Sequence, residues 1–172
     1  MEQNDQIQYK KTPVANGTLM KVIKAGMTSH IESEQTWNYY VTKGKPELKE
    51  LAQSGENASA VCDAPAVIVP VYSTKGDAPT AEDVEKSRAI GNMLVIMEEM
   101  ELAGEWVNAM EDEAQQEAIS AALHISSEYV PMGILTLGYP EKTPEETKKA
   151  KKKKKDTSFR KRIHFVDSLG RY

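Results

Sequence analysis

The sequence predicts an α+β fold, in which helices and strands intermix along a single chain. Two stretches carry this prediction. Residues 66–72 read AVIVPVY, a nearly continuous apolar run typical of a strand buried on both faces. Between Ile90 and Met100, apolar residues recur at three- and four-residue spacing, which is typical of one packing face of a helix. The methionines of that face are more typical of core filler than of a cofactor contact.

The first half of the chain is expected to alternate helices and strands. The expected elements are a turn at 16–17, a helix over 18–24, a strand over 37–42, a helix over 46–54, a loop at 55–57 and the strand over 66–72. Thr18 can cap the first helix, and Pro46 suits the first turn of the second. Pro70 lies inside the second strand and indicates a bulge or an edge position.

The second half is expected to be similarly mixed. The expected elements are a helix over 80–101, an extended piece over 105–108, a helix over 111–123, a strand over 132–139 and a short final strand over 162–166. Thr80 and Asp83 have the spacing of a capping box, with Asp in place of the usual Glu. Acidic residues in the first turn of the helix expected over 111–123 suit the helix dipole.

The charge of the chain is distributed unevenly. The 172 residues, 40% of them hydrophobic, suit one domain with a core, and the net charge is −4. Residues 148–172 hold eleven Lys or Arg and two Asp or Glu, a net charge of +9, which leaves −13 for the remainder. We therefore expect a domain over 1–147 and a basic C-terminal tail over 148–172 that includes the final strand.

Several functional classes are disfavoured by composition. Cys62 is the single cysteine, so no intrachain disulfide can form, which fits a reducing compartment. The first residues show no signal-peptide pattern, and no apolar run approaches the roughly 18–20 residues needed to span a bilayer, so we expect a cytoplasmic protein without a membrane partner. A basic run could bind nucleic acid, but the acidic body opposes a polyanion.

No motif supplies an acid–base or metal-dependent mechanism. The sequence has no Gly-rich phosphate loop and no nucleophile elbow. The three histidines, His30, His124 and His164, are scattered without metal-ligand spacing, and no metal site is expected. A chain without its own catalytic constellation can let a bound cofactor carry the chemistry.

Five sequence blocks, in order, suggest such a cofactor. Residues 87–110 read SRAIGNMLVIMEEMELAGEWVNAM, and residues 123–144 read LHISSEYVPMGILTLGYPEKTP. Together they resemble the second half of the nitroreductase family. The matching positions are Asn92, Met93, Leu102, Trp106, Val107, Ile125, Glu128, Tyr129, Pro131 and 137–140. Residues 9–26, 34–52 and 62–72 resemble the family's start, its strand–helix segment and its apolar strand.

The resemblance implies a homodimeric FMN enzyme with a mainly antiparallel sheet flanked by helices. Such an enzyme takes hydride from NAD(P)H and reduces a small-molecule electron acceptor, a nitroaromatic, quinone or similar compound. It needs no catalytic side chain, because the flavin carries the chemistry. The FMN-binding domain would be residues 1–147. The implied cofactor-binding residues are Lys10, Lys11, Ser33, Gln35, Val107, Asn108, Ala109, Arg160 and Arg162. The sequence leaves open the acceptor and the choice between NADH and NADPH.

The departures from the family pattern concern the phosphate end of FMN. Asn4, Asp5 and Ile7 align with the segment whose two arginines grip the phosphate, and Asn108 aligns with a glycine beside the flavin. The run 148–155 could restore positive charge, although a solvated tail is the commoner meaning of such a run. The alternative function is therefore a flavin-poor or flavin-free dimer that binds or senses a ligand without turnover.

Overall fold

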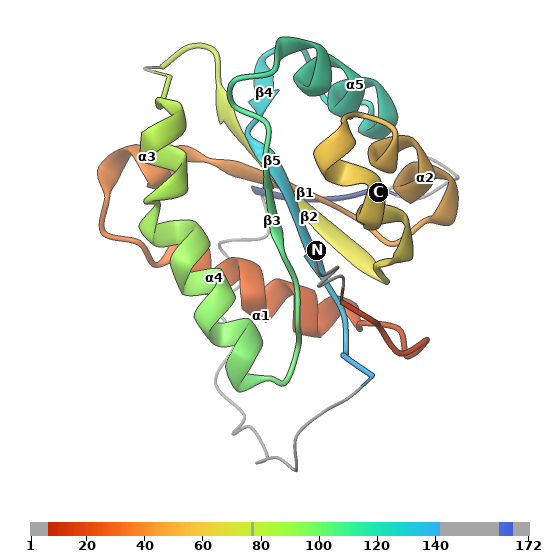
Figure 1. The fold of residues 1–172 in the computed structure, drawn as a ribbon. Coiled ribbons are helices and arrows are strands. Elements are labelled where there is room, and N and C mark those ends of the chain that lie inside the picture. Colours follow the sequence, from red (N-terminus) through yellow and green to blue (C-terminus); the bar gives the residue numbers. More distant parts are fainter. Residues whose placement is uncertain (1–6, 77, 142–161, 167–172) are drawn as a thin grey trace, which may run out of the picture.

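The computed structural model describes residues 7–76, 78–141 and 162–166 and has an α+β arrangement of one sheet between helices (Figure 1). The helices are α1 Asn16–Met27, α2 Lys45–Ala52, α3 Ala81–Glu85, α4 Arg88–Glu99 and α5 Glu113–Leu123, with short 3-10 helices η1 Glu32–Thr36 and η2 Glu56–Asp63. The strands are β1 Asn38–Thr42, β2 Ala66–Ser73, β3 Trp106–Asn108, β4 Tyr129–Pro131, β5 Gly133–Leu137 and β6 Ile163–Val166. The predicted fold class is confirmed.

The sheet is mainly antiparallel, as predicted. Its strand order is β3-β5-β2-β1-β6, with β4 pairing with β2 beside β5. The β1–β2, β2–β4, β2–β5 and β3–β5 pairs are antiparallel, whereas β6 runs parallel to β1. The expected short final strand is therefore confirmed over 163–166. Strands β3 and β6 form the two edges.

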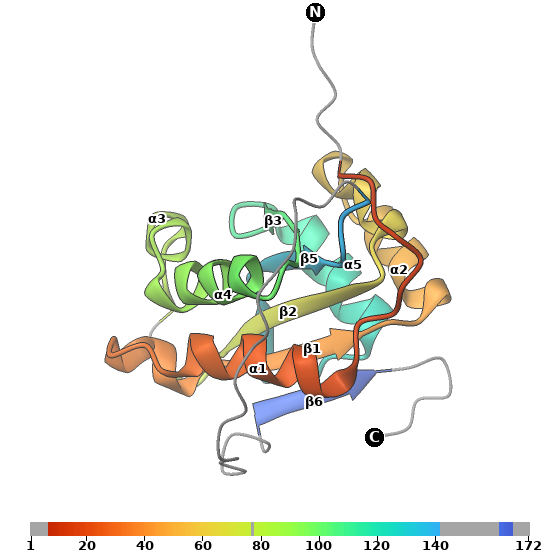
Figure 2. The ribbon, with the colours of Figure 1, turned by 90° about the horizontal axis from the view of Figure 1, so that it is seen from below.

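Helices cover both faces of the sheet. Figure 2 shows α1 and α4 on one face, with α2 and α5 on the other. The side chains of β2 alternate between these layers, because successive residues of a strand point to opposite faces. Ala66 and Ile68 join the core beneath α1 and α4, and Val67 and Val69 join the core beneath α2 and α5. Burial on both faces explains the nearly continuous apolar run of this strand.

Pro70 lies in a central strand, so the expected edge position is wrong. The chain beside it changes from β4 to β5 at Met132, whose N–H donates to the Pro70 carbonyl at 2.9 Å. The N–H and C=O of one strand residue point to the same side of the strand. An N–H at position 70 would therefore have pointed toward Met132, between β4 and β5, so no regular ladder bond is lost because proline has no N–H. The strand expected over 132–139 is confirmed as β5, over Gly133–Leu137, whereas β4 before it was not predicted.

The long helix expected over 80–101 is also wrong, because it divides into α3 and α4. The capping box at the start of α3 is present, with Thr80 and Asp83 each bonding the other's backbone N–H. A new helix then starts after Ser87, whose hydroxyl accepts from Ile90 N at 3.1 Å. Such a side-chain cap satisfies a helix N–H that has no partner within the helix, so it marks a new start.

Smaller differences concern helix ends. Helix α1 begins at Asn16, so 16–17 is not a turn, and Thr18 lies inside the helix rather than capping it. Residues 56–57 belong to η2 rather than to a loop, and α5 starts after a cap by Asp112. None of the described helices is long and apolar enough to cross a membrane. The run 148–155 lies outside the described residues.

The apolar stripe expected over 90–100 packs inside the chain. Ile90 and Met97 are buried within the chain, together with Met93, as expected for core-filling methionine. Ile90 and Met97 are therefore covered within a single chain and need no partner subunit to bury them. Among the described residues, the large apolar side chains that remain exposed are Val95, at 57%, and Ile31, at 43%.

Candidate functional site

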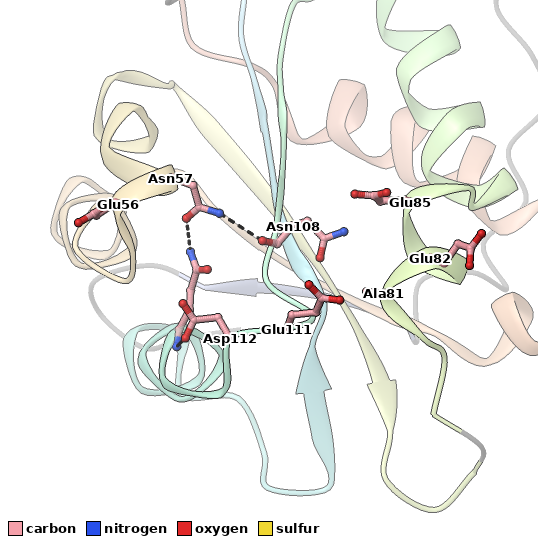
Figure 3. Close-up of a pocket in the computed structure, with 9 residues that line it drawn as sticks. Glu56, Asn57, Ala81, Glu82, Glu85, Asn108, Glu111 and Asp112 are labelled. Carbon is pink, nitrogen blue, oxygen red and sulfur yellow. Dashed lines mark hydrogen bonds between the residues drawn. The ribbon is translucent and has the colours of Figure 1, made fainter.

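A cavity of about 810 Å³ lies where η2, α3, the end of β3 and the start of α5 meet (Figure 3). This volume is within the range of about 300–1,000 Å³ that is common for small-molecule sites. The residues around it come from segments that are far apart in the sequence. The lining residues are Glu56, Asn57, Ala81, Glu82, Glu85, Asn108, Glu111, Asp112 and Gln115.

A chain of amide groups fixes one wall of the cavity. Gln115, which is 1% exposed, donates from Nε2 to Asn57 Oδ1 at 2.9 Å and to Ser54 Oγ at 3.3 Å. Asn57 in turn donates from Nδ2 to the backbone oxygen of Asn108 at 3.2 Å, as Figure 3 shows. These bonds connect α5 through η2 to the end of β3, so three separate elements hold the position of Asn108.

The backbone of Asn108 faces the open edge of the sheet. Toward β5, Glu105 O accepts from Thr136 N and Ala109 N donates to Met132 O, each at 3.0 Å. Backbone groups alternate sides along an antiparallel ladder, so those of Asn108 point the other way. The bond from Asn57 to the Asn108 oxygen agrees with this direction. The Asn108 N–H therefore points outward from β3, on the side where the cavity lies.

The cavity is acidic. Its lining includes five carboxylates, namely Glu56, Glu82, Glu85, Glu111 and Asp112, and none of its lining residues is Lys or Arg. A concave surface lined by one sign of charge concentrates the local potential, so this one attracts cations and opposes anions. Among the residues that the structure describes, no group of three or more His, Cys, Asp or Glu is arranged to hold a metal ion.

The chain was compared with protein families, curated proteins and solved structures. No protein-family model matches the chain. A curated relative from Methanothermobacter thermautotrophicus, named "Putative NADH dehydrogenase/NAD(P)H nitroreductase", is 24% identical over 139 residues, which cover 80% of this chain and 73% of that protein. The structure of an FMN-dependent nitroreductase from Clostridium difficile R20291 matches with a TM-score of 0.70 and 23% identity, over 86% of this chain and 87% of the other.

A nitroreductase family protein from Clostridium novyi NT matches with a TM-score of 0.71 and 17% identity, covering 95% of this chain and 89% of the other. The chain has the nitroreductase fold. The resemblance indicated by the five sequence blocks is therefore confirmed, and the agreement extends over nearly the whole described chain.

The nitroreductase fold places one group of the predicted flavin-binding residues at the cavity. Asn108 lines it, whereas the neighbouring Val107 and Ala109 are buried, at 8% and 1% exposure, and do not line it. No other predicted residue lines the cavity. The residues that sequence reasoning missed are the remaining lining positions, because 56–57, 81–85 and 111–115 carry no shared motif.

A second group lies at η1, toward the opposite edge of the sheet. Gln35 donates from Nε2 to Ser29 O at 2.7 Å, and the Arg162 guanidinium donates to the Gln35 carbonyl. Ser33 is exposed on the same short helix. Strand β1, which follows η1, is separated from β3 by β2 and β5, which is about 14 Å at the usual strand spacing. Within a single chain, the two groups therefore adjoin strands that are three strand spacings apart.

The remaining predicted cations lie elsewhere. Lys10 and Lys11 are exposed, and Lys10 N donates to Tyr139 O at 2.7 Å. Gly133, at the start of β5, pairs with Asn108, whereas Tyr139 lies beyond the other end of β5. Tyr139 is six residues after Gly133, which corresponds to about 20 Å in an extended chain. Arg160 lies outside the described residues. The cavity therefore gains no cation from this segment.

Beside the cavity, a hollow of about 20 Å³ is lined in part by Ile7, Tyr9, Asn57 and Val107. Burial raises the pKa of Tyr9, although its hydroxyl bonds Thr136 Oγ1 at 3.1 Å. Asn57 borders both spaces, so the segment that begins at Ile7 passes next to the acidic cavity. Ile7 is one of the positions where the family pattern has a phosphate-binding arginine.

The site fits the ring system of FMN but not its phosphate. The ring system matches the volume of the cavity and the donor edge at Asn108. The dianionic phosphate does not match a lining of five carboxylates without a cation. An FMN whose ring lay at this edge would need its phosphate held by basic groups outside the cavity lining.

Proposed function

We propose that the protein is an FMN-dependent oxidoreductase of the nitroreductase type. It passes electrons from NAD(P)H through FMN to a nitroaromatic, quinone or similar small acceptor. The observation that carries this proposal is the outward N–H of Asn108 on an edge strand, beside a cavity of about 810 Å³. The relatives support it by name, since one is an FMN-dependent nitroreductase and another carries a nitroreductase name.

In this proposal the chain binds and orients, while bound FMN supplies the hydride chemistry. The backbone of 107–109 positions the ring edge, and the Asn57–Gln115 amide pair holds that backbone in place. Lys10, Lys11, Arg160 and Arg162 remain the proposed sources of charge for the phosphate. The proposed FMN-binding domain is 1–147, with 148–172 as a basic tail.

The proposal includes a homodimer. Strand β1, which follows the η1 group with Ser33 and Gln35, lies three strand spacings from β3 in the same chain. A second copy could bring its η1 group to this cavity, so that each site combines residues of two chains. The exposed Val95 and Ile31 supply apolar surface for such a contact. Light scattering at micromolar protein concentration tests the mass, and a monomer of about 19 kDa contradicts the proposal.

A flavin-free ligand-binding dimer is the second candidate function. The acidic cavity favours it, because the lining opposes the phosphate of FMN. It also agrees with the loss of both N-terminal arginines at Asn4 and Ile7. In that case the cavity would accept a neutral or cationic small molecule rather than a flavin nucleotide.

One experiment separates the two functions. FMN is titrated into flavin-free protein at low and high salt, and flavin fluorescence reports binding. The complex is then mixed anaerobically with NADH or NADPH, and loss of the visible flavin absorbance reports hydride transfer. The proposal expects salt-sensitive binding followed by bleaching. An absence of binding at low salt would instead support the flavin-free candidate.

A further inference from the structure

The side-chain amide of Asn108 has a fixed orientation. Its Oδ1 accepts from the backbone N–H of Met110 at 2.8 Å. Rotating the amide by half a turn would place its NH2 group against that N–H, where two donors would face each other. Asn108 Nδ2 is therefore kept away from Met110, and Figure 3 shows it on the side of the residue that faces α3.

Both acceptors of Asn108 are engaged inside the protein. The backbone oxygen accepts from Asn57 Nδ2 at 3.2 Å, and the side-chain oxygen accepts from Met110 N. Both kinds of donor remain open. The backbone N–H points outward from β3, and Nδ2 has no hydrogen-bond partner among the residues that the structure describes. Asn108 therefore presents free donors to the cavity, while each of its oxygens already accepts one hydrogen bond.

Other parts of the lining have the opposite character. Glu85 on α3 and Glu111 next to α5 present carboxylates, which only accept hydrogen bonds when ionised, whereas the Glu82 carboxylate accepts from Lys86 Nζ at 3.0 Å. A ligand between these walls meets donors on one side and acceptors on the other. Loss of a hydrogen bond to a buried or half-buried donor costs more than the bond contributes, so mismatched ligands are discriminated against.

We propose that Asn108 is a specificity-determining residue, whose locked amide selects a planar ligand that presents a hydrogen-bond acceptor to the end of β3. Two sources supply that chemistry: the edge of the flavin ring, or the nitro or quinone oxygen of the electron acceptor. The proposal rests on the function proposed above for its biological meaning. The donor preference itself depends only on the geometry of Asn108.

Asn108→Asp tests the donor without removing the structural bond. A carboxylate oxygen still accepts from Met110 N, but Nδ2 and its hydrogens are gone. Ala81→Asp is the matched control, because it adds the same charge to the cavity lining at the first residue of α3 and leaves Asn108 intact. Asn108→Gly is the second variant, since it removes Nδ2 without adding charge. Thermal unfolding checks that all three proteins fold.

Two binding assays separate the flavin from the substrate. In the flavin arm, FMN is titrated into flavin-free protein by fluorescence. In the substrate assay, nitrobenzene and aniline are titrated separately into ¹⁵N-labelled protein, with FMN present if it binds. Backbone amide resonances report affinity in every protein, and the side-chain NH2 resonances of Asn108 report contact in wild type. Nitrobenzene presents acceptors and aniline presents donors, while the rings are the same size.

We expect Asn108→Asp to weaken one of the acceptor ligands by about ten- to hundredfold more than Ala81→Asp does. Weaker FMN binding identifies the flavin edge as the ligand, and weaker nitrobenzene binding alone identifies the substrate. Equal weakening by the two Asp variants, or unchanged binding in both arms, overturns the inference. If wild type binds no FMN, the proposed function fails, and the nitrobenzene–aniline comparison on flavin-free protein still decides the donor preference.

Discussion

The two edges of the sheet hold their candidate flavin-binding residues in different ways. At the β3 edge, the neutral amides of Asn57 and Gln115 fix a backbone position beside an acidic cavity. At the β1–β6 edge, a buried carboxylate fixes η1, because Glu34 accepts from Ser29 Oγ at 2.6 Å and from Ala89 N at 2.9 Å. The β3 edge is held by neutral hydrogen bonds and the β1–β6 edge by a carboxylate, so substitutions should affect the two edges differently.

The largest effect is expected from Glu34→Ala. Glu34 is 6% exposed, and its carboxylate also accepts from Arg88 N at 3.3 Å at the start of α4. Removing it leaves several donors without a partner and a helix N-terminus without its anion. We expect a loss of about 3 kcal/mol in the free energy of unfolding. Urea denaturation measures it, with the exposed Glu32→Ala as the control.

A change of equal size in Glu32→Ala would show that the loss is not specific to the buried carboxylate. We expect this control to remain within about 0.5 kcal/mol of wild type, because Glu32 is exposed on the same short helix.

Gln115→Leu should have the next largest effect. Leucine fills a similar volume but leaves Asn57 Oδ1 and Ser54 Oγ without their donor. We expect about 2 kcal/mol of destabilisation, together with faster amide exchange around 57 and 108. Hydrogen-exchange mass spectrometry reports the local change, and the exposed Glu117→Leu on the same helix serves as the control. Unchanged exchange around 108 would contradict the role given to the amide chain.

Adding a cation near the acidic cavity should improve binding of the anionic cofactor FMN. Ile7 borders the hollow beside the cavity, where an arginine could reach the phosphate of a bound flavin. We expect Ile7→Arg to tighten FMN binding about tenfold at low salt, through a charge-assisted contact. Gln53→Arg adds the same charge on the exposed end of α2. Equal tightening by both variants would mean a general charge effect.

The smallest effect concerns pH at the β6 edge. His164 stacks on Tyr40 with ring centroids 4.5 Å apart and lies 3.2 Å from Asn38 Oδ1. Burial lowers the pKa of His164, so the folded state favours the neutral ring. The stacking contribution is therefore complete above the ordinary histidine pKa of about 6.5 and is lost as pH falls through the lower folded value.

Amide exchange of β6 is measured at a pH above the ordinary histidine pKa and at a pH well below it. It should show faster opening of the strand at the lower pH. His164→Phe keeps an aromatic ring at the same position but cannot be protonated, so its exchange should depend less on pH once the intrinsic rate is corrected. The same pH dependence in both proteins would exclude His164 as the cause.

Most of the fold could be predicted from local patterns. Strand β2 was predicted within one residue, because burial on both faces imposes an unbroken apolar run. The capping box at Thr80 and the proline at the start of α2 were predicted because both act within one helical turn. Such signals depend on neighbours in sequence, which the sequence displays directly.

The errors arose where a distant residue decides the local structure. The break between α3 and α4 coincides with bonds from Glu34, which is more than fifty residues away. Pro70 is tolerated in a central strand because Met132 interrupts the neighbouring strands at that point. The cavity shares this character, since Asn57, Glu85 and Glu111 come from three elements with no common motif.

The sequence by itself determined the α+β class, the nitroreductase resemblance and the place of Asn108 at the end of a short strand. Periodicity, caps and family motifs depend on residues that are close together in the sequence. Only the tertiary structure decided which donors Asn108 exposes and that its surroundings are acidic. It also decided that Ser33 and Gln35 lie toward the opposite edge of the sheet. These features depend on ladder direction and strand order, which bring distant residues together or keep them apart.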